Sequence, residues 1–320
     1  MVHPLTEAQE VQLFEKMVLI REVELEISRR YPEGKMRCPT HLSVGQESTP
    51  AILHLFLKDS DYAVSTHRSH AHYIAKGGDL FAMLAEIYGL DEGCSKGRGG
   101  SMHLVDKEVG FMGSSAIVGN SVPVGTGLGL AQKLDSKDGI SVVYIGDAAV
   151  EEGVFFESAN FAAARRIPVL FVCENNGFSV YSGIQGRQPE NRTIKSLAEG
   201  LGLQAAEASF TDIDSSVSVI AAAVEHCRTT REPFFLEIES ERYLEHCGPN
   251  NDDHLGYRDL NQLEKIKLRD PIDQLSEKLK AKNVDMSSIF LQVKNYVGQT
   301  FTAVEKLHAR DGSETLGGAL

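Results

Sequence analysis

The chain has 320 residues, 42% of them hydrophobic, which suits one large α/β domain with helical additions or two closely joined domains. Its 32 Lys and Arg against 45 Asp and Glu give a formal net charge of −13, which opposes non-specific binding to nucleic acid or to an anionic membrane surface. No apolar run approaches the ~20 residues that a membrane span requires, so we expect a cytoplasmic protein.

The N-terminal residues 1–39 form a helical segment in our interpretation. Apolar side chains recur at helical spacing between residues 7 and 30, and Pro32 followed by Glu33-Gly34 supplies a stop. The apolar positions that carry this prediction are Val11, Phe14, Val18 and Leu25. We expect this helix to pack on the main domain or on a partner chain.

Residues 40–255 read as one α/β domain. Short, continuously apolar runs predict buried strands, and helical stretches long enough for crossovers lie between them. The predicted strands are Tyr62–Ser65, Ser141–Ile145, Val169–Cys173 and Phe234–Ile238, and the clearest helices are Val154–Arg165 and Ser215–Thr230. The pattern predicts a three-layer α/β/α, doubly wound fold with a mostly parallel sheet.

Residues 256–320 form a C-terminal helical segment of two or three helices, interrupted at Asp270-Pro271. The five cysteines are widely separated, are odd in number and include no CxxC pair. We therefore interpret them as free thiols.

Polar residues follow two of the predicted strands. Asp147 comes directly after strand 141–145, and Asn175-Asn176 follows strand 169–173. Because an open parallel sheet binds its ligands at the carboxyl ends of its strands, a carboxylate and an amide oxygen there could share one Mg²⁺. The amides of Ala148 and Ala149 open the next helix, whose positive end suits a diphosphate.

Two ordinary strand ends with turn residues would explain the Asp/Asn pair equally well, but its spacing resembles a known fingerprint. Gly146-Asp147-Ala148 followed by Asn175-Asn176 resembles the GDG…NN pattern of thiamine-diphosphate enzymes. The surrounding segment, YIGDAAVEEGVFFESANFAAARRIPVLFVCENN, resembles the E1 α subunits of 2-oxo acid dehydrogenase complexes more than single-chain thiamine enzymes. The similarity runs from about residue 41 to residue 258.

Five further blocks carry the same resemblance. They are HLSVGQE at 41–47, HRSH at 67–70, KGRGGSMH at 96–103, IVG at 117–119 and RYLEH at 242–246. The resemblance implies thiamine diphosphate and Mg²⁺ as cofactors. It implies His41 and His246 as catalytic residues, and Asp147, Asn176 and Phe178 as magnesium ligands. The implied cofactor-binding residues are His67, Arg68, Ile117, Val118, Gly146, Asp147, Ala148, Ala149, Asn176 and His246.

The sequence departs from the family at three positions. Ala148 replaces the second glycine of the fingerprint. His67 replaces an aromatic residue that carries a hydroxyl, and its imidazole could still donate a hydrogen bond to a phosphate. Cys247 stands where complex-bound E1 α subunits often carry a phosphorylatable serine, so we expect that regulation to be absent. The same loop differs enough to put recognition of a lipoyl domain in doubt.

The resemblance implies an E1-type α subunit that decarboxylates a 2-oxo acid, or cleaves acetoin, and transfers the product to an acceptor. A β subunit would supply the glutamate that activates the pyrimidine ring, in an α₂β₂ assembly, and a lipoyl acyltransferase is a further candidate partner. Glu47 matches a structural glutamate of the family and is a poor substitute for the pyrimidine-activating glutamate of the β subunit. Two alternatives remain: a carboligase or transferase that uses no lipoyl acceptor, and a non-catalytic interaction subunit.

Two other patterns suggest sites that we consider weaker. His67, His70 and His72 form an HxxHxH cluster, but the spacing does not define a zinc site, and we favour a loop in which these side chains serve other purposes. The glycines of GTGLG at 125–129 imitate a dinucleotide-binding motif without the preceding strand or the acidic residue. We favour close helix packing there.

Overall fold

The computed structural model describes residues 4–36 and 38–317, with side chains as far as residue 310. The predicted N-terminal helix is present as α1, Glu7–Arg30, and begins with a capping box between Thr6 and Gln9. It ends in a short 3₁₀ turn and Gly34, whose left-handed φ of +72° suits glycine. The buried face differs from the predicted one at Leu25, which is 38% exposed, whereas Leu13 and Met17 are fully buried.

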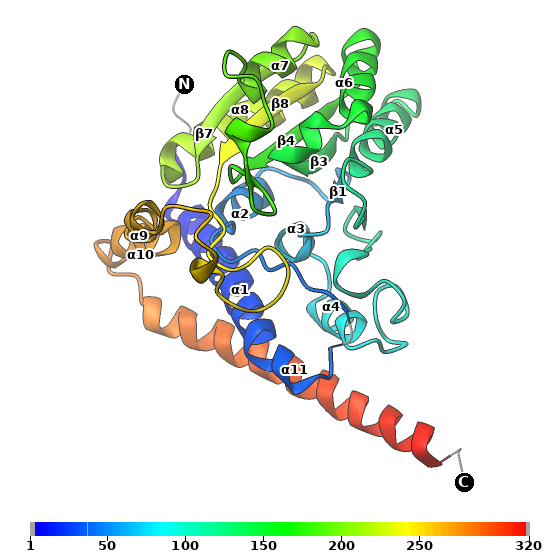
Figure 1. The fold of residues 1–320 in the computed structure, drawn as a ribbon, viewed down its shortest axis with the longest axis vertical. Coiled ribbons are helices and arrows are strands. Elements are labelled where there is room, and N and C mark those ends of the chain that lie inside the picture. The colour runs from blue at the N-terminus through cyan, green and yellow to red at the C-terminus, as the bar shows by residue number, and fades with distance from the viewer. Residues whose placement is uncertain (1–3, 37, 318–320) are drawn as a thin grey trace.

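Six parallel strands form the central sheet, in the order β2-β1-β3-β4-β8-β7 (Figure 1). Their bounds are β1 Tyr62–Ser65, β2 Phe111–Ser114, β3 Ser141–Gly146, β4 Val169–Asn175, β7 Gln204–Ser209 and β8 Phe234–Glu239. The four predicted strands are confirmed. The two that the apolar pattern missed, β2 and β7, are the edges of the sheet.

Helices cover both faces of the sheet, which confirms the three-layer α/β/α architecture. On β4, Phe171 and Cys173 pack into one core, while Leu170 and Val172 pack into the other. Helices α5 (Ser121–Leu134), α6 (Gly153–Arg165) and α7 (Ile194–Gly200) contribute to the first core. Helices α1, α2 (Ser48–His54), α3 (His70–Lys76), α4 (Leu80–Ile87) and α8 (Ile213–Thr230) contribute to the second.

Three α-helices follow β8 in the described residues, where the sequence predicts two or three. They are α9 (Leu260–Lys267), α10 (Pro271–Lys280) and α11 (Met286–Gly317). Asp270 caps the amide of Ile272 at the start of α10, with Pro271 in the first turn, where proline is tolerated. Helix α11 lies along α1 (Figure 1). Within the described residues, no helix combines the length and the apolar character needed to cross a bilayer.

Strand order reverses between β1 and β3. From β1 the chain proceeds to the edge strand β2, and then returns to β3, from which β4, β8 and β7 extend in the other direction. Ligands of open parallel sheets bind outside the carboxyl ends of the strands at such a point. The fold therefore directs attention to the residues that follow β1 and β3.

Helix α5 confirms close packing at the GTGLG motif. A Cβ on Gly125 would lie 2.7 Å from Val64 Cγ2 and nearer still to Val143 Cγ2 on the sheet. A Cβ on Gly129 would lie 2.9 Å from Ile167 Cγ2. The glycines thus let the helix approach the sheet closely, which accounts for the motif without a nucleotide.

Candidate active site

A hollow lies at the carboxyl edge of the sheet, where the strand order reverses. It contains about 780 Å³ of space when the open solvent at its entrance is included. Every site residue predicted from the sequence lines it except His41 and Ile117: the lining includes His67, Arg68, Val118, Gly146, Asp147, Ala148, Ala149, Asn176, Phe178 and His246. Ile117 is 68% exposed and lies outside the lining.

Asp147 follows β3 and is the most deeply buried carboxylate at this edge, at 1% exposure. One of its oxygens forms an ion pair with Arg187, whose guanidinium also pairs with Glu151. Burial raises the pKa of Asp147, and the contact with Arg187 opposes that rise. Asp147 therefore keeps a charge partner supplied by a segment 40 positions later in the chain.

The predicted helix Val154–Arg165 is present as α6, but the amides of Ala148 and Ala149 do not open it, contrary to our expectation. Residues Asp147–Glu151 form a 3₁₀ turn, and the α-helix begins only at Gly153. The break between the turn and the helix has a local cause. Glu152 has an extended backbone with ψ of 136°, which separates the two elements. The amides of Ala148 and Ala149 still lie in the first turn after β3, where helical amides lack intrahelical acceptors.

The two asparagines after β4 have different surroundings. Asn175 donates to Glu237 Oε1 at 2.7 Å and accepts from the amide of Gly177 at 2.9 Å, so it shapes the turn. Asn176 lines the hollow, and its Oδ1 accepts from the amide of Phe178 at 3.1 Å. Because β3 and β4 are paired neighbours, Asn176 and Asp147 occupy adjacent strand ends.

His70 and His72 of the HxxHxH segment lie in helix α3 and not in the loop that we expected, and each has its own partners. His70 contacts Glu24 Oε2 at 3.0 Å and Ser101 Oγ at 2.7 Å. His72 contacts Ser65 Oγ at 2.7 Å and Glu174 Oε2 at 3.1 Å. Both are structural histidines with both ring nitrogens in use.

His67 instead meets His41 and His246, and of these three His67 and His246 line the hollow. The ring centroids are 4.6 Å apart for His41 and His67, 5.1 Å for His41 and His246, and 5.4 Å for His67 and His246. Burial, with the charge of nearby Arg68, lowers the pKa of His41 to about 2, of His67 to about 3 and of His246 to about 4. All three imidazoles are therefore neutral at pH 7.

Arg68 ties together the loops that carry these histidines. Its guanidinium donates to the carbonyls of Leu42 and of His246, the latter at 3.1 Å. It lines the hollow and is 6% exposed, and burial lowers its pKa to about 9, which leaves it charged at pH 7. Contact with a diphosphate remains a prediction for this residue, because two of its bonds already serve the backbone.

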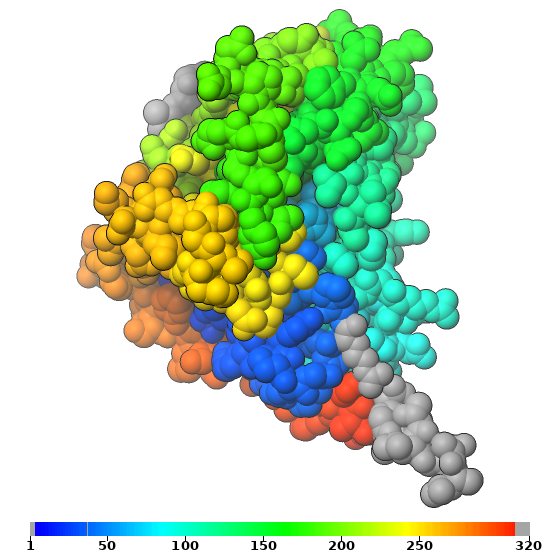
Figure 2. All heavy atoms as spheres, in the orientation of Figure 1, coloured from blue at the N-terminus to red at the C-terminus, as the bar shows by residue number. Residues whose placement is uncertain are grey.

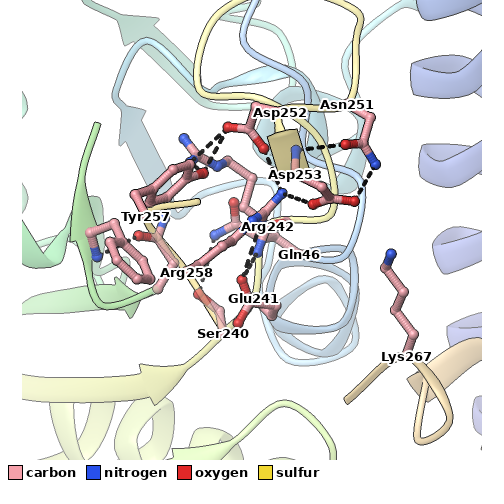
Figure 3. Close-up of polar contacts among 12 residues, drawn as sticks. Gln46, Ser240, Glu241, Arg242, Asn251, Asp252, Asp253, Tyr257, Arg258 and Lys267 are labelled. Atoms are coloured by element: carbon pink, nitrogen blue, oxygen red, sulfur yellow. Dashed lines mark hydrogen bonds and ion pairs between the residues drawn. The ribbon is translucent and has the colours of Figure 1, made fainter. Parts of the chain in front are cut away.

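The loop after β8 is anchored by a buried polar network, shown in Figure 3. Asp252, 1% exposed, accepts from Tyr257 at 2.7 Å and from Arg258 at 2.6 Å, and Arg242 donates to the Tyr257 hydroxyl at 2.6 Å. The same loop also has an apolar anchor, because Tyr243 is only 8% exposed and packs in the core.

The segment between β5 (Phe178–Ser179) and β6 (Ser182–Gly183) forms the other wall of the hollow. Tyr257 from the loop after β8 packs against Phe178 and Tyr181, with centroids 5.2 and 5.0 Å apart. Figure 2 shows the two segments, green and yellow, side by side on one face. Val180, at the turn, lines the hollow with a φ of +55°, a rare value for a β-branched residue.

Sequence reasoning missed several residues of the site. Arg187 stands alone in a polar loop, so no spacing pattern marks it. Glu174 directly precedes the Asn-Asn pair and lines the hollow with its Oε1 buried and without a hydrogen-bond partner in the described chain. A charged residue inside an otherwise apolar strand was the available signal for Glu174.

Comparison with known proteins identifies the family of the chain. The chain matches the family described as "Dehydrogenase E1 component" over residues 15–304. It is 33% identical over 291 residues to the "Pyruvate dehydrogenase E1 component subunit alpha" of Rickettsia bellii, covering 90% of this chain and 88% of that protein.

Two other relatives carry related descriptions. The protein of the same description from Rhizobium meliloti is 32% identical over 84% of this chain and 77% of its own length. A testis-specific, mitochondrial form of the subunit from Rattus norvegicus is 30% identical over 88% of this chain and 70% of its own length. The chain therefore belongs to the dehydrogenase E1 component family, as a member of its thiamine-diphosphate-dependent α subunits.

Proposed function

We propose that this chain binds thiamine diphosphate through Mg²⁺ and, with a β subunit, decarboxylates a 2-oxo acid whose acyl unit passes to an acceptor. The observation that carries the proposal is the placement of Asp147 and Asn176 on adjacent parallel strand ends in one hollow. The names of the relatives favour pyruvate as the substrate.

The residues at this edge fit both cofactors. A buried carboxylate, an amide oxygen and a main-chain carbonyl are hard oxygen ligands of the kind Mg²⁺ takes, and Asp147, Asn176 and Phe178 would supply them. The amides of Ala148 and Ala149, with Arg68 and His67, would hold the diphosphate. When bound, thiamine diphosphate supplies the ylid and the electron sink that decarboxylation requires.

His41 and His246 would act at the mouth of the hollow as neutral imidazoles. Their lowered pKa values keep both rings neutral, so each has one nitrogen that can accept a proton or a hydrogen bond and one N–H that can donate a hydrogen bond. The contact between their rings, at 5.1 Å, keeps both within reach of one substrate. Gly146 lines the hollow, and a Cβ at this position would point into open space with no atom within 4 Å. The absence of a side chain therefore leaves that space free.

Two observations support a separate β subunit. Glu47, which could have activated the pyrimidine, is 2% exposed and is held by Arg21 at 2.9 Å and by the amide of Gly45 at 3.0 Å. Val118 at the rim of the hollow is 47% exposed, and Ile117 beside it is more so, which leaves apolar surface for a partner to cover. We propose an α₂β₂ assembly.

Calorimetry on the chain co-purified with its β subunit tests the proposal. We expect thiamine diphosphate to bind in the presence of Mg²⁺ and not after chelation, and Asp147→Ala to abolish that binding while circular dichroism stays unchanged. Asp147→Asn is the matched control for side-chain volume, and we expect it to retain weak binding.

An assay of CO₂ release from pyruvate and from branched-chain 2-oxo acids, with acetoin cleavage in parallel, then identifies the substrate. Cofactor binding without turnover of any of these compounds would contradict the decarboxylase assignment. Unchanged cofactor affinity in Asp147→Ala would contradict the metal assignment.

A further inference from the structure

Three imidazoles, two of which line the hollow, converge from segments far apart in the chain. His41 precedes α2, His67 follows β1, and His246 lies in the loop after β8. One ring nitrogen from each lies within 4.8 Å of those of the other two. No spacing pattern in the sequence connects them.

The backbone around the three histidines is fixed before any ligand binds. His41 forms a parallel β-bridge with Gly248, and the amide of Gly248 donates to the carbonyl of Thr40 at 2.8 Å. Arg68, adjacent to His67 in the chain, donates to the carbonyl of His246 at 3.1 Å. The three loops are therefore held together by hydrogen bonds to main-chain carbonyls, which leaves the imidazoles themselves available.

His41 also has an unused donor or acceptor. The residue is 8% exposed, and its Nδ1 is buried without a hydrogen-bond partner in the described part of the chain. A buried polar atom in this state costs about 1–3 kcal/mol unless a ligand or an ordered water satisfies it. The atom belongs to a residue already in ring contact with His67 and His246.

We propose that His41, His67 and His246 form a binding site for a divalent transition metal ion of the Zn²⁺ class. Three neutral imidazoles with an open fourth position are a known ligand set for Zn²⁺, which prefers metal–nitrogen distances of about 2.0–2.1 Å. Ring nitrogens within 4.8 Å of one another reach that geometry through side-chain rotations that move them by roughly 1 Å.

The charges around the histidines do not forbid a cation. The positive charges of Arg68 and Arg242 repel a cation. The negative charges of Glu24 and Glu174 act on Arg68 and oppose that repulsion, and the negative charge of Asp252 does the same at His246. Ligand type separates this site from the one at Asp147. Imidazole nitrogen selects Zn²⁺, Cu²⁺, Ni²⁺ or Co²⁺, whereas carboxylate and carbonyl oxygens select Mg²⁺.

Occupation of this site would inhibit the enzyme, a consequence that rests on the proposed function. The metal would take the lone pairs of His41 and His246 that the reaction needs, and it would stand at the mouth of the hollow. Zn²⁺ would then inhibit at concentrations at which Mg²⁺ supports activity.

Co²⁺ serves as the probe because four-coordinate Co²⁺ absorbs visible light. The metal-stripped complex of this chain with its β subunit is titrated with Co²⁺ in excess Mg²⁺, without thiamine diphosphate. We expect one Co²⁺ per α chain with the intense visible bands of a four-coordinate site, and displacement of Co²⁺ by Zn²⁺. His67→Phe should weaken Co²⁺ binding at least about tenfold, since it removes one of three ligands.

His254→Phe is the matched control, because His254 is exposed and outside the cluster. It should leave Co²⁺ affinity unchanged, and thermal unfolding establishes that each variant is folded. His246→Gln replaces His67→Phe if the latter fails to fold. Equal Co²⁺ affinity in the wild type and in a folded cluster variant, or absence of the visible bands, would overturn the proposal.

Calorimetry with Mg²⁺ and thiamine diphosphate, run on the same preparation, keeps the two proposals apart. Co²⁺ binding lost in His67→Phe, in a protein that does not bind thiamine diphosphate, would support the histidine site and contradict the proposed function. Binding of thiamine diphosphate without the Co²⁺ bands would support the proposed function and contradict the histidine site.

Discussion

Arg187 and Asp147 form a buried ion pair beneath the hollow, with side chains 11% and 2% exposed. The same guanidinium pairs with Glu151 and donates from Nε to the carbonyl of Ser182 at 3.1 Å. Arg187 thus fastens the segment that carries Phe178 and Val180 onto the turn that carries Asp147. The wall of the hollow and its deepest carboxylate are held by one side chain.

This pairing predicts the behaviour of Arg187→Gln. Burial raises the pKa of Asp147 and Arg187 opposes the rise, so its loss should raise that pKa further and let protons compete with Mg²⁺. We expect Mg²⁺-dependent binding of thiamine diphosphate to weaken about tenfold at pH 6 and less at pH 8. Calorimetry at both pH values measures it.

Glu151→Gln is the control for Arg187→Gln, because it removes one contact of the guanidinium and keeps the pair with Asp147. We expect a smaller effect from it. Tighter Mg²⁺ binding in Arg187→Gln at both pH values would show instead that the guanidinium competes with the metal.

The central fold could be predicted because its strands are buried on both faces. Val169–Cys173 is a continuous apolar run because alternate side chains of this strand enter different cores. The strand in the structure extends two residues beyond the predicted C-terminal end, to Asn175. Strand Gln204–Ser209 contains Glu207 and small residues, which an edge strand tolerates and which hide it from the apolar pattern.

Residue spacing alone predicts the part of the site that follows two neighbouring strands, whereas only the resemblance to a known family indicated the three histidines. Asp147 and Asn176 follow strands, so strand order places them together. His41, His67 and His246 meet only after three loops are folded, and the Asp147 partner comes from a loop without a motif. Tertiary contacts between polar side chains leave no period in the sequence from which to infer them.

Helix α5 offers a test of packing with two glycines in one helix. Gly125→Ala would force a methyl group into Val64 and Val143, whereas Gly127→Ala meets nothing within 4 Å in this chain. We expect Gly125→Ala to destabilise by about 1–3 kcal/mol through overpacking. Gly127→Ala should stabilise by up to about 1 kcal/mol, because alanine is the better helix former.

Urea unfolding of the two glycine variants measures these changes. Equal effects of both substitutions would show that helix propensity, and not contact with the sheet, decides the role of the motif. Nicotinamide nucleotides should leave the unfolding of the wild type unchanged.

Asp252 should be the most sensitive position of the loop network in Figure 3. Asp252→Ala removes the carboxylate that pairs with buried Arg242 and one of the three that pair with buried Arg258, and breaking a buried pair costs about 3–5 kcal/mol. The control Asp214→Asn removes an ion pair with Lys278 that is largely exposed, which is worth about 0–1 kcal/mol. Urea unfolding compares them.

Proteolysis adds a local readout for the same variants. We expect Asp252→Ala to speed cleavage within residues 241–258, and Mg²⁺ with thiamine diphosphate to slow it in the wild type. A loss of stability in Asp252→Ala no larger than that in Asp214→Asn would mean that the network does not anchor the loop.

His246 should affect turnover far more than cofactor binding. If it exchanges protons with the substrate, His246→Ala lowers kcat by about 10²–10⁴-fold, whereas thiamine diphosphate affinity changes less than about tenfold. Because the pKa of His246 is lowered to about 4, the imidazole is neutral throughout pH 5.5–8. The kcat of the wild type should therefore show no titration of this group across that range.

Cys247→Ala is the matched control for His246→Ala, because Cys247 is the exposed neighbour in the same loop and has no role in the proposed chemistry. A surface change of this kind should leave kcat within about twofold and stability within about 0.5 kcal/mol. Steady-state assays of CO₂ release across the pH range, with calorimetry on each variant, separate turnover from binding. Full activity of His246→Ala would make this residue a solvated loop histidine and would leave His41 as the proton-exchanging group of this chain.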